Sequence, residues 1–236
     1  MNYTLVFAFL RQRLASPLRV ILVAVVAGFP LLAMLAAGGS LSTLGNSYFL
    51  ALIVSAGLIG QDVSNGTLQL LFARPVSRPS YVLSRWFGAT LGAGALIVLE
   101  LALGAAAMAL HHDPPTPGDV GVFLANGVLM AAGAAAVVTL ASSLVTGLGD
   151  LGLLLVAWLL GLTLPQIGMA RGWSWMVFTG EQLQHLVWPQ LDVGTLVSRG
   201  FSWHDLTVYL STVIGSLAIA VVAVNRRELS YASANA

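Results

Sequence analysis

The chain has 236 residues, of which 58% are hydrophobic and only 8% carry a charge, and its mean hydropathy is +0.89. So few charged side chains cannot cover the surface of a soluble protein of this size, and most of that surface must therefore be solvated by lipid. All ten basic residues are arginines and there is no cysteine, which excludes a lysine-dependent GxxxxGK[ST] nucleotide site, a Schiff-base enzyme, disulfides and thiolate zinc sites.

The first part of the chain predicts an amphipathic helix followed by two membrane crossings. Residues 1–16 mix apolar and basic side chains, which is typical of a helix that lies at the membrane interface. Residues 18–37 form an apolar run long enough to cross a bilayer core of about 30 Å. A glycine-rich turn at residues 38–40 then leads into a second crossing, residues 41–60.

A polar stretch, residues 60–86, separates this pair of apolar runs from the next one. Within it, Asn65 and Gly66 predict a turn, and the apolar residues that follow predict a short helix that Pro75 must end. This helix is too short to cross a membrane. Its apolar face therefore needs a groove on a partner protein, or the membrane interface, to be buried.

The rest of the chain predicts four more crossings, which makes an all-α integral membrane protein with six transmembrane helices in a single transmembrane domain, residues 1–236. The remaining predicted spans are residues 86–110, 120–146, 148–165 and 206–224. The loop at residues 111–119 contains three prolines and cannot be helical.

The longest stretch without a predicted crossing, residues 165–205, contains four of the six tryptophans. Tryptophan prefers the headgroup level of the membrane, so this segment is expected to lie on the membrane face. Thr179 and Gln182 have the spacing of a capping box, and Pro189 ends the apolar run that follows them. We expect one or two short lateral or re-entrant helices here, between the fifth and sixth spans.

The distribution of arginines predicts the orientation of the chain. If the N-terminus is cytoplasmic, eight of the ten arginines lie on the cytoplasmic side, and only Arg171 and Arg199 lie outside. Positive residues favour the cytoplasmic side, so both termini and residues 60–86 are predicted to face the cytoplasm. The expected location is the inner (cytoplasmic) membrane, which the chain crosses several times.

The polar stretch also carries a motif. Asp62, then Gly66-Thr67, then Leu70-Leu71 and then the run Arg74-Pro75-Val76-Ser77-Arg78 resemble the acidic-x(3)-GT-x(2)-LL-x(3)-PVSR signature of the six-helix permease subunits of ABC type-2 exporters. One residue departs from the family pattern, because Gln61 stands where a second acid is common.

The resemblance implies a function for this stretch. In that family the segment between the second and third membrane helices is a coupling helix that docks into a separate ATP-binding subunit. The implied partners are that subunit and a second permease copy, identical or not, in the lipid bilayer, and ATP and Mg²⁺ would be bound by the partner and by no site on this chain. The coupling residues implied here are Asp62, Gly66, Thr67, Leu68, Leu71, Phe72, Arg74 and Arg78.

Glu100 is predicted to lie well inside the third span, where a charge costs about 2.5–3.5 kcal/mol on insertion scales. One interpretation is a carboxylate that takes part in substrate or proton movement along a central cavity. The other is a protonated acid that hydrogen-bonds to a neighbouring helix, for instance near Asn126 in the fourth span. Glu100 and Asn126 are therefore the candidate polar site inside the membrane.

Other function classes find less support in the sequence. The four histidines, His111, His112, His185 and His204, lack the spacing of a metal site, so solvated loop histidines are the favoured interpretation and no metal is expected. No GxSxG, HExxH or paired-acid catalytic pattern occurs, and no basic stripe suggests nucleic-acid binding. A membrane-embedded enzyme and a structural or sensory membrane protein remain the alternatives to a transport subunit.

Overall fold

The computed structural model describes residues 3–72, 76–200 and 202–233, and within these ranges the regular structure is entirely helical. The helices in chain order are α1 (Tyr3–Leu14), α2 (Pro17–Ala37), the 3₁₀ turn η1 (Leu41–Leu44), α3 (Ser47–Ser55), α4 (Gly60–Ser64), α5 (Thr67–Phe72), α6 (Arg78–Leu110), α7 (Pro117–Leu144), α8 (Gly149–Arg171), α9 (Ser174–Val187), α10 (Val193–Arg199) and α11 (Trp203–Ser233).

Six segments of the described chain are long and apolar enough to cross a membrane, which confirms the predicted class of a multi-pass helical membrane protein. They are Pro17–Ala37, Leu41–Ser64, Arg78–Leu110, Pro117–Leu144, Gly149–Arg171 and Trp203–Arg226. The third begins at Arg78 rather than at Trp86, because Ser77 precedes it in an extended conformation and Pro79 lies in its first turn, where a proline is well tolerated.

The second of these segments is not one continuous helix. It consists of η1, α3 and α4, with a break at residues 56–59, whereas the apolar run alone predicts a single helix over residues 41–60. Gly57 has a φ of +67°, a left-handed conformation that glycine adopts without steric cost. The break therefore interrupts the helical hydrogen bonds in the middle of an apolar sequence.

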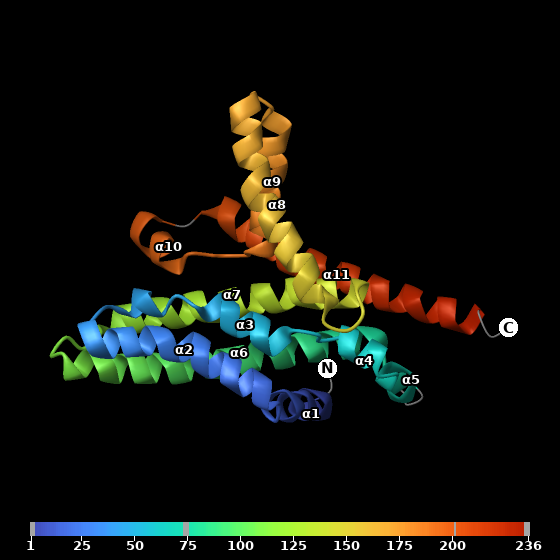
Figure 1. Ribbon diagram of the computed structural model, residues 1–236, viewed down its shortest axis with the longest axis horizontal. Coiled ribbons are helices and arrows are strands. Elements are labelled where there is room, and N and C mark those ends of the chain that lie inside the picture. Colours follow the sequence, from blue (N-terminus) through green and yellow to red (C-terminus); the bar gives the residue numbers. More distant parts are fainter. Residues whose placement is uncertain (1–2, 73–75, 201, 234–236) are drawn as a thin grey trace.

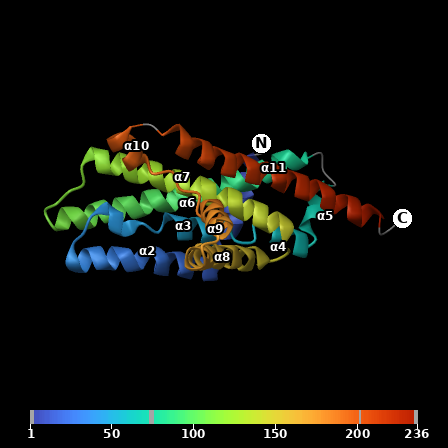
Figure 2. The same cartoon turned by 90° about the horizontal axis from the view of Figure 1, so that it is seen from above.

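α6 and α7 form the centre of a bundle that also contains α3, α2 and α11 (Figures 1 and 2). Small residues allow the helices to approach closely, since Ala134 and Ala135 of α7 are fully buried. α7 begins with a capping box in which Thr116 and Asp119 bond to each other's backbone N–H groups. α1 packs through Val6 and Phe9 against Gly88 of α6, so the N-terminal helix is partly buried in the bundle.

α8 and α9 form a helical hairpin that projects from the side of the bundle (Figure 1). The fifth predicted span ends at residue 165, but α8 continues through Pro165 to Arg171, and Gly172 ends it in a left-handed conformation. α9 lies directly against α8, because a Cβ atom at Gly180 would come within 2.3 Å of Pro165 Cδ. Two helices, α9 and α10, lie between α8 and α11, where the sequence predicts one or two short helices. The predicted capping box is wrong, because Thr179 lies inside α9 and its hydroxyl donates to the Trp175 carbonyl oxygen.

The ends of the bundle carry different segments. α4, α5 and the C-terminal end of α11 lie toward one end, and the loop between α6 and α7 lies at the opposite end (Figures 1 and 2). Positive-inside counting predicts the same grouping. The polar segment α4–α5 and the C-terminal end of α11 therefore face the same side of any membrane that the bundle crosses.

Candidate functional site

The α4–α5 segment forms a short helical hairpin whose turn is exposed. Ser64, Asn65 and Gly66 are exposed, and Gly66 has a φ of +68°. Among the described residues, no atom beyond the chain neighbours lies within 4 Å of the position that a Cβ would take at Gly66, so the turn has open space beside it. We refer to residues 64–66 as the tip, a part of the segment in which all three residues are exposed.

Asp62, the acid of the sequence motif, lies inside the protein. Its Oδ2 atom accepts a 2.6 Å hydrogen bond from the Tyr81 hydroxyl and a second, charge-assisted bond from Arg85 Nη2, and the residue is 6% exposed. Tyr81 and Arg85 both belong to the first turns of α6. Asp62 therefore fastens α4 to α6 and does not present its carboxylate to a partner.

The candidate apolar anchors of α5, Leu68, Leu71 and Phe72, are half-buried against the protein's own core. The Phe72 ring makes an edge contact with Tyr81 at a centroid distance of 5.6 Å, and the Arg78 guanidinium lies 5.9 Å from the same ring. These side chains thus support the fold of the segment. Thr67 is half-buried as well, and Arg74 lies outside the described residues.

The backbone of the break at residues 56–59 is held by side chains from α1, α2 and α8. Arg13 of α1 donates hydrogen bonds to the carbonyl oxygens of Ala56 and Gly57, the second at 2.8 Å. Arg19 of α2 donates to the same Ala56 oxygen at 3.1 Å, and Asp150 of α8 accepts a 2.6 Å bond from Gly57 N–H. In a continuous helix these backbone N–H and C=O groups would bond to each other, but here they bond to side chains that are distant in sequence.

Helix α7 and the loop after it complete this network. The Ser142 hydroxyl oxygen accepts bonds from the N–H groups of Ile59 and Gly60, at 2.9 and 2.8 Å. Gly147 N–H donates to the Gly60 carbonyl oxygen at 2.9 Å. The break is thus bonded to helices α1, α2, α7 and α8, directly before α4.

Sequence reasoning missed these residues. Two arginines near the N-terminus are typical of lipid headgroup contacts, and an aspartate between two apolar runs is typical of a solvated turn. Arg13, however, is 5% exposed, and Asp150 is fully buried. Burial, and then repulsion by Arg19 and Arg85, lowers the pKa of Arg13 to about 9. Gly57 is the one sequence signal for the break, but a single glycine within an apolar run does not predict that the helix is interrupted.

Glu100 is buried in the bundle, with an exposed fraction of 1%. Both of its carboxyl oxygens lack a hydrogen-bond partner among the described residues. Asn46, the N-cap of α3, lies beside the carboxyl group, and its own Oδ1 atom is also buried without a hydrogen-bond partner among the described residues. Glu100 is therefore a buried carboxyl group in a membrane-spanning helix, with Asn46 as a polar neighbour.

Asn126 does not serve as the partner of Glu100. Its Oδ1 atom accepts a 2.7 Å hydrogen bond from the N–H of Val193, the first residue of α10. Asn126 therefore fastens α10 to α7 and satisfies one of the free N–H groups of a helix N-terminus. The two residues of the candidate intramembrane site have separate environments.

This difference leads to opposite expectations for two matched substitutions. Glu100→Leu is expected to raise the free energy of unfolding by about 1–3 kcal/mol, because it removes a buried group that has no hydrogen bond. Asn126→Leu is expected to lower it by a similar amount, because Val193 N–H loses its acceptor. Thermal unfolding of the purified variants in detergent measures both changes. Destabilisation by Glu100→Leu would show that the carboxyl group makes a structural bond after all.

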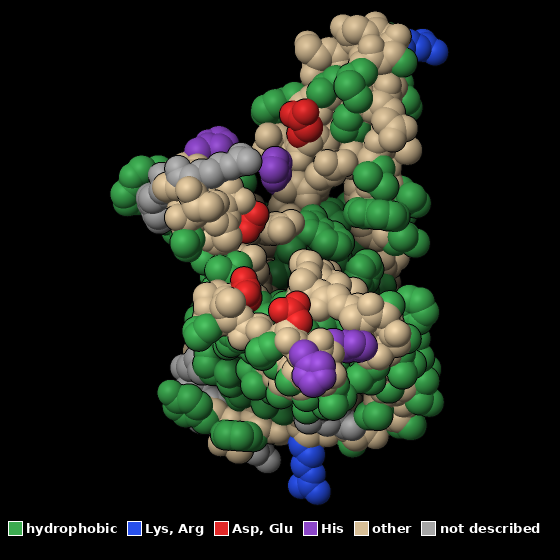
Figure 3. Space-filling model, turned by 90° about the vertical axis from the view of Figure 1, so that its left-hand side faces the viewer, with side chains coloured by type: hydrophobic (Ala, Val, Ile, Leu, Met, Phe, Trp, Pro, Cys, Tyr) green, Lys and Arg blue, Asp and Glu red, His purple; other side chains and the backbone are tan. Residues whose placement is uncertain are grey.

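Two of the histidines line one cavity, and both lie in helices rather than in the predicted loops, His185 in α9 and His204 in α11. The cavity has a volume of about 700 Å³ and lies between the α8–α9 hairpin, α10 and α11, where Asp192 and Asp205 also line it. Figure 3 shows this hollow, with acidic and histidine side chains near its edge. Among the described residues, no three His, Cys, Asp or Glu side chains are placed to hold a metal ion. Asp192 caps α10, and its bond from the Thr195 hydroxyl lowers its pKa.

Comparison with known proteins adds no assignment. Neither protein families nor curated protein sequences give a match to this chain. The structure is that of a multi-pass helical membrane protein, with six described segments long and apolar enough to cross a membrane. Any more specific function has to be inferred from the residues and their geometry.

Proposed function

We propose that this chain is the membrane-spanning permease subunit of an ABC type-2 exporter, and that its α4–α5 segment docks into a separate ATP-binding subunit. The observation that carries the proposal is the exposed tip, residues 64–66, on a segment whose base is bonded to the helices of the bundle. The motif around Asp62, Gly66 and Thr67 supports the same assignment.

The contacts at the base suggest how force would pass from the tip into the membrane. Asp62 ties α4 to α6 through Tyr81 and Arg85. The break directly before α4 is bonded to α1, α2, α7 and α8. A displacement of α4 and α5 would therefore reach five other helices through hydrogen bonds. An isolated loop on flexible connections could transmit no such displacement.

In this proposal the chemistry takes place on the partner. ATP and Mg²⁺ bind to the ATP-binding subunits, and closure of those subunits moves the α4–α5 segments of two permease copies. The substrate then passes across or out of the membrane between the copies. This chain supplies the membrane pathway and the docking segment. Glu100, as a buried and unbonded carboxyl group, is a candidate for contact with the substrate or a proton.

Co-purification with the ATP-binding subunit encoded beside this chain tests the proposal. Asn65→Arg places a long charged side chain on the exposed tip and is expected to reduce recovery of the ATP-binding subunit at least tenfold, because a docking groove cannot bury an unpaired charge. Asp113→Arg, in the α6–α7 loop at the opposite end, serves as the control and is expected to leave recovery unchanged. If no ATPase co-purifies with the wild-type chain, the protein belongs to the enzyme or structural alternatives.

Leu68, Leu71 and Phe72 also support the fold, so a loss of binding on their replacement has to be distinguished from a loss of stability. Truncation of a central interface anchor typically costs about 2–4 kcal/mol, or roughly 30- to 1000-fold in affinity. For Phe72→Ala, recovery of the partner therefore has to be compared with thermal unfolding of the variant alone. Arg78→Ala is expected to have a mild effect, of about 1 kcal/mol if the arginine contacts a lipid phosphate.

A further inference from the structure

A small apolar cavity lies between α1, α2, α3 and α6, beside the break. Its volume is about 140 Å³. Leu10, Val23, Val54 and Leu96 contribute apolar side chains to its walls, and Gly92 leaves room for them. An apolar cavity of about 150 Å³ in another protein stays dry and takes up benzene, so a space of this size and lining suits a few carbons of a hydrocarbon chain.

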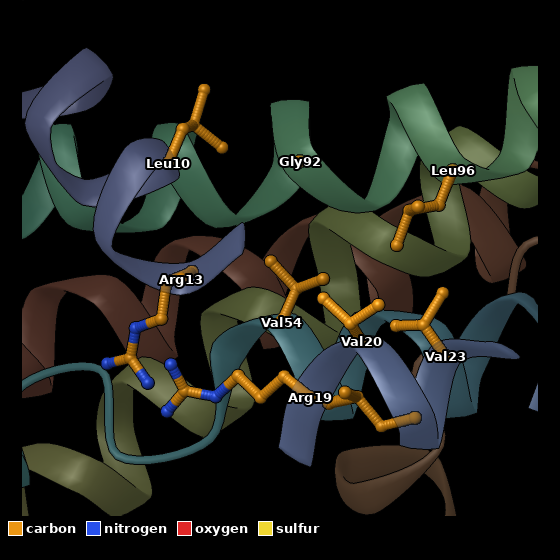
Figure 4. A pocket seen from close by; sticks show the side chains of 9 residues that line it. Leu10, Arg13, Arg19, Val20, Val23, Val54, Gly92 and Leu96 are labelled. Atoms are coloured by element: carbon orange, nitrogen blue, oxygen red, sulfur yellow. The ribbon is translucent and has the colours of Figure 1, made fainter. Parts of the chain in front are cut away.

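Two arginines border the same cavity. Figure 4 shows the guanidinium groups of Arg13 and Arg19 close together at one side, while Val20, Val23 and Leu96 lie at the other. The aliphatic stems of the arginines belong to the cavity wall, and their charged ends reach the break. The cavity thus has apolar walls, and two guanidinium groups lie beside it at the break.

The positive charge at this side is not balanced by the residues around it. The charged groups that interact with Arg13 are Arg19, Arg85, Asp62 and Asp150, which gives three guanidinium groups against two carboxylates. The two nitrogens at the end of the Arg13 side chain bond to neutral carbonyl oxygens, and its Nε atom is buried without a partner among the described residues. A buried group with surplus charge is stabilised by an anion nearby.

We propose that this cavity binds an anionic phospholipid of the surrounding bilayer, with part of one acyl chain in the apolar space and the phosphate on Arg19. Arg19 is half-buried and its hydrogen bonds are only partly shielded from the surroundings, whereas Arg13 is buried and supplies positive charge behind it. Guanidinium groups bind phosphate oxygens with two parallel hydrogen bonds. A phospholipid satisfies both halves of the site, which neither a free anion nor a neutral lipid does.

A lipid bound at this site would affect the conformation of the break at residues 56–59. Arg19 donates to the Ala56 carbonyl oxygen and lies 3.4 Å from Gln61 Oε1 in α4. A phosphate on this guanidinium competes for its remaining N–H groups and fixes its position. The lipid would therefore stabilise the conformation of the chain directly before α4. This site does not depend on the identity of any ATP-binding partner.

Lipid counting by native mass spectrometry tests the proposal on the purified full chain. The protein is titrated with dioleoyl phosphatidylglycerol, dioleoyl phosphatidylcholine or glycerol phosphate, which represents the headgroup without chains. The wild type is expected to bind phosphatidylglycerol at least fivefold more tightly than phosphatidylcholine, and glycerol phosphate is expected not to compete. Arg19→Gln is expected to weaken phosphatidylglycerol binding about fivefold, the effect typical of one arginine near a lipid phosphate.

Matched variants separate the site from the general lipid surface. Val23→Phe fills the cavity and is expected to abolish the preference for phosphatidylglycerol. Val25 lies on the same helix, is 61% exposed and does not line the cavity, so Val25→Phe is expected to keep the preference. Arg11→Gln removes an exposed arginine of α1 and serves as the charge control. Equal binding of the two lipids by the wild type, full competition by glycerol phosphate, or an unchanged preference in Val23→Phe would each overturn the proposal.

Discussion

Replacement of Asp62 by alanine is expected to lower the free energy of unfolding by about 3–5 kcal/mol, because it leaves the Arg85 guanidinium buried without its partner. The Tyr81 hydroxyl loses its acceptor at the same time. This is a large fraction of the stability of most domains. Thermal unfolding in detergent and size-exclusion profiles of the expressed variants would show the loss directly.

Two further variants test whether the unpaired charge of Arg85 causes this loss of stability. Tyr81→Phe removes one hydrogen bond to the carboxylate and keeps the ion pair, so it is expected to cost about 1.5–3 kcal/mol. The double variant Asp62→Ala and Arg85→Met removes both charges and is expected to recover most of the stability lost in Asp62→Ala. A stable Asp62→Ala protein that merely fails to bind the ATP-binding subunit would mean that Asp62 acts on the partner and not inside the chain.

Gly60→Ala is expected to destabilise the protein by about 1–3 kcal/mol or more, because the added methyl group has no space. A Cβ atom at this position would lie 2.6 Å from the Gly147 carbonyl oxygen and 2.8 Å from that of Val145. Both are backbone atoms, which cannot rotate away as a side chain can. The substitution would separate α4 from the loop between α7 and α8, where Gly147 N–H bonds to the Gly60 oxygen.

Gly94→Ala is the matched control. Gly94 lies within α6, and no atom is found within 4 Å of the position of its added Cβ. In a helix interior alanine is favoured over glycine by about 0.8–1.0 kcal/mol, so this variant is expected to be slightly more stable than the wild type. Thermal unfolding midpoints of the two variants should move in opposite directions. A Gly60→Ala protein as stable as Gly94→Ala would show that the close approach at residue 60 is not maintained.

The sequence predicts the helices well and the contacts between polar groups poorly. Long apolar runs must become helices in lipid, since no other local structure satisfies the backbone there, and this predicts six spans. The apolar runs do not predict the break at Gly57, because the backbone groups of the break are satisfied by residues such as Arg13 and Asp150 that are distant in sequence. Pro165 suggests an end to the fifth helix, yet α8 continues, because the Gly161 carbonyl oxygen that Pro165 leaves without an N–H donor accepts a 3.0 Å bond from the Gln184 side chain of α9.

In the candidate site, too, the local structure is predictable from the sequence and the contacts between distant residues are not. The Asn65-Gly66 turn and the short helix after it follow from local chemistry and are present. The burial of Asp62 depends on Tyr81 and Arg85 of another helix, which no local pattern reveals. The pairing of Asn126 with Val193, and the meeting of two distant histidines at one cavity, depend likewise on tertiary structure.

The projecting hairpin has a mechanical consequence. α8 and α9 are closely packed, because at Gly168 and Gly180 an added Cβ atom would come within 3 Å of the facing helix. With 23 residues, α8 is about 34 Å long, so a rotation of about ten degrees at its base displaces its far end by about 6 Å. The base is where Asp150 bonds to the break. A small rotation of α8 at its base, next to α4, would therefore be enlarged at the far end of the hairpin.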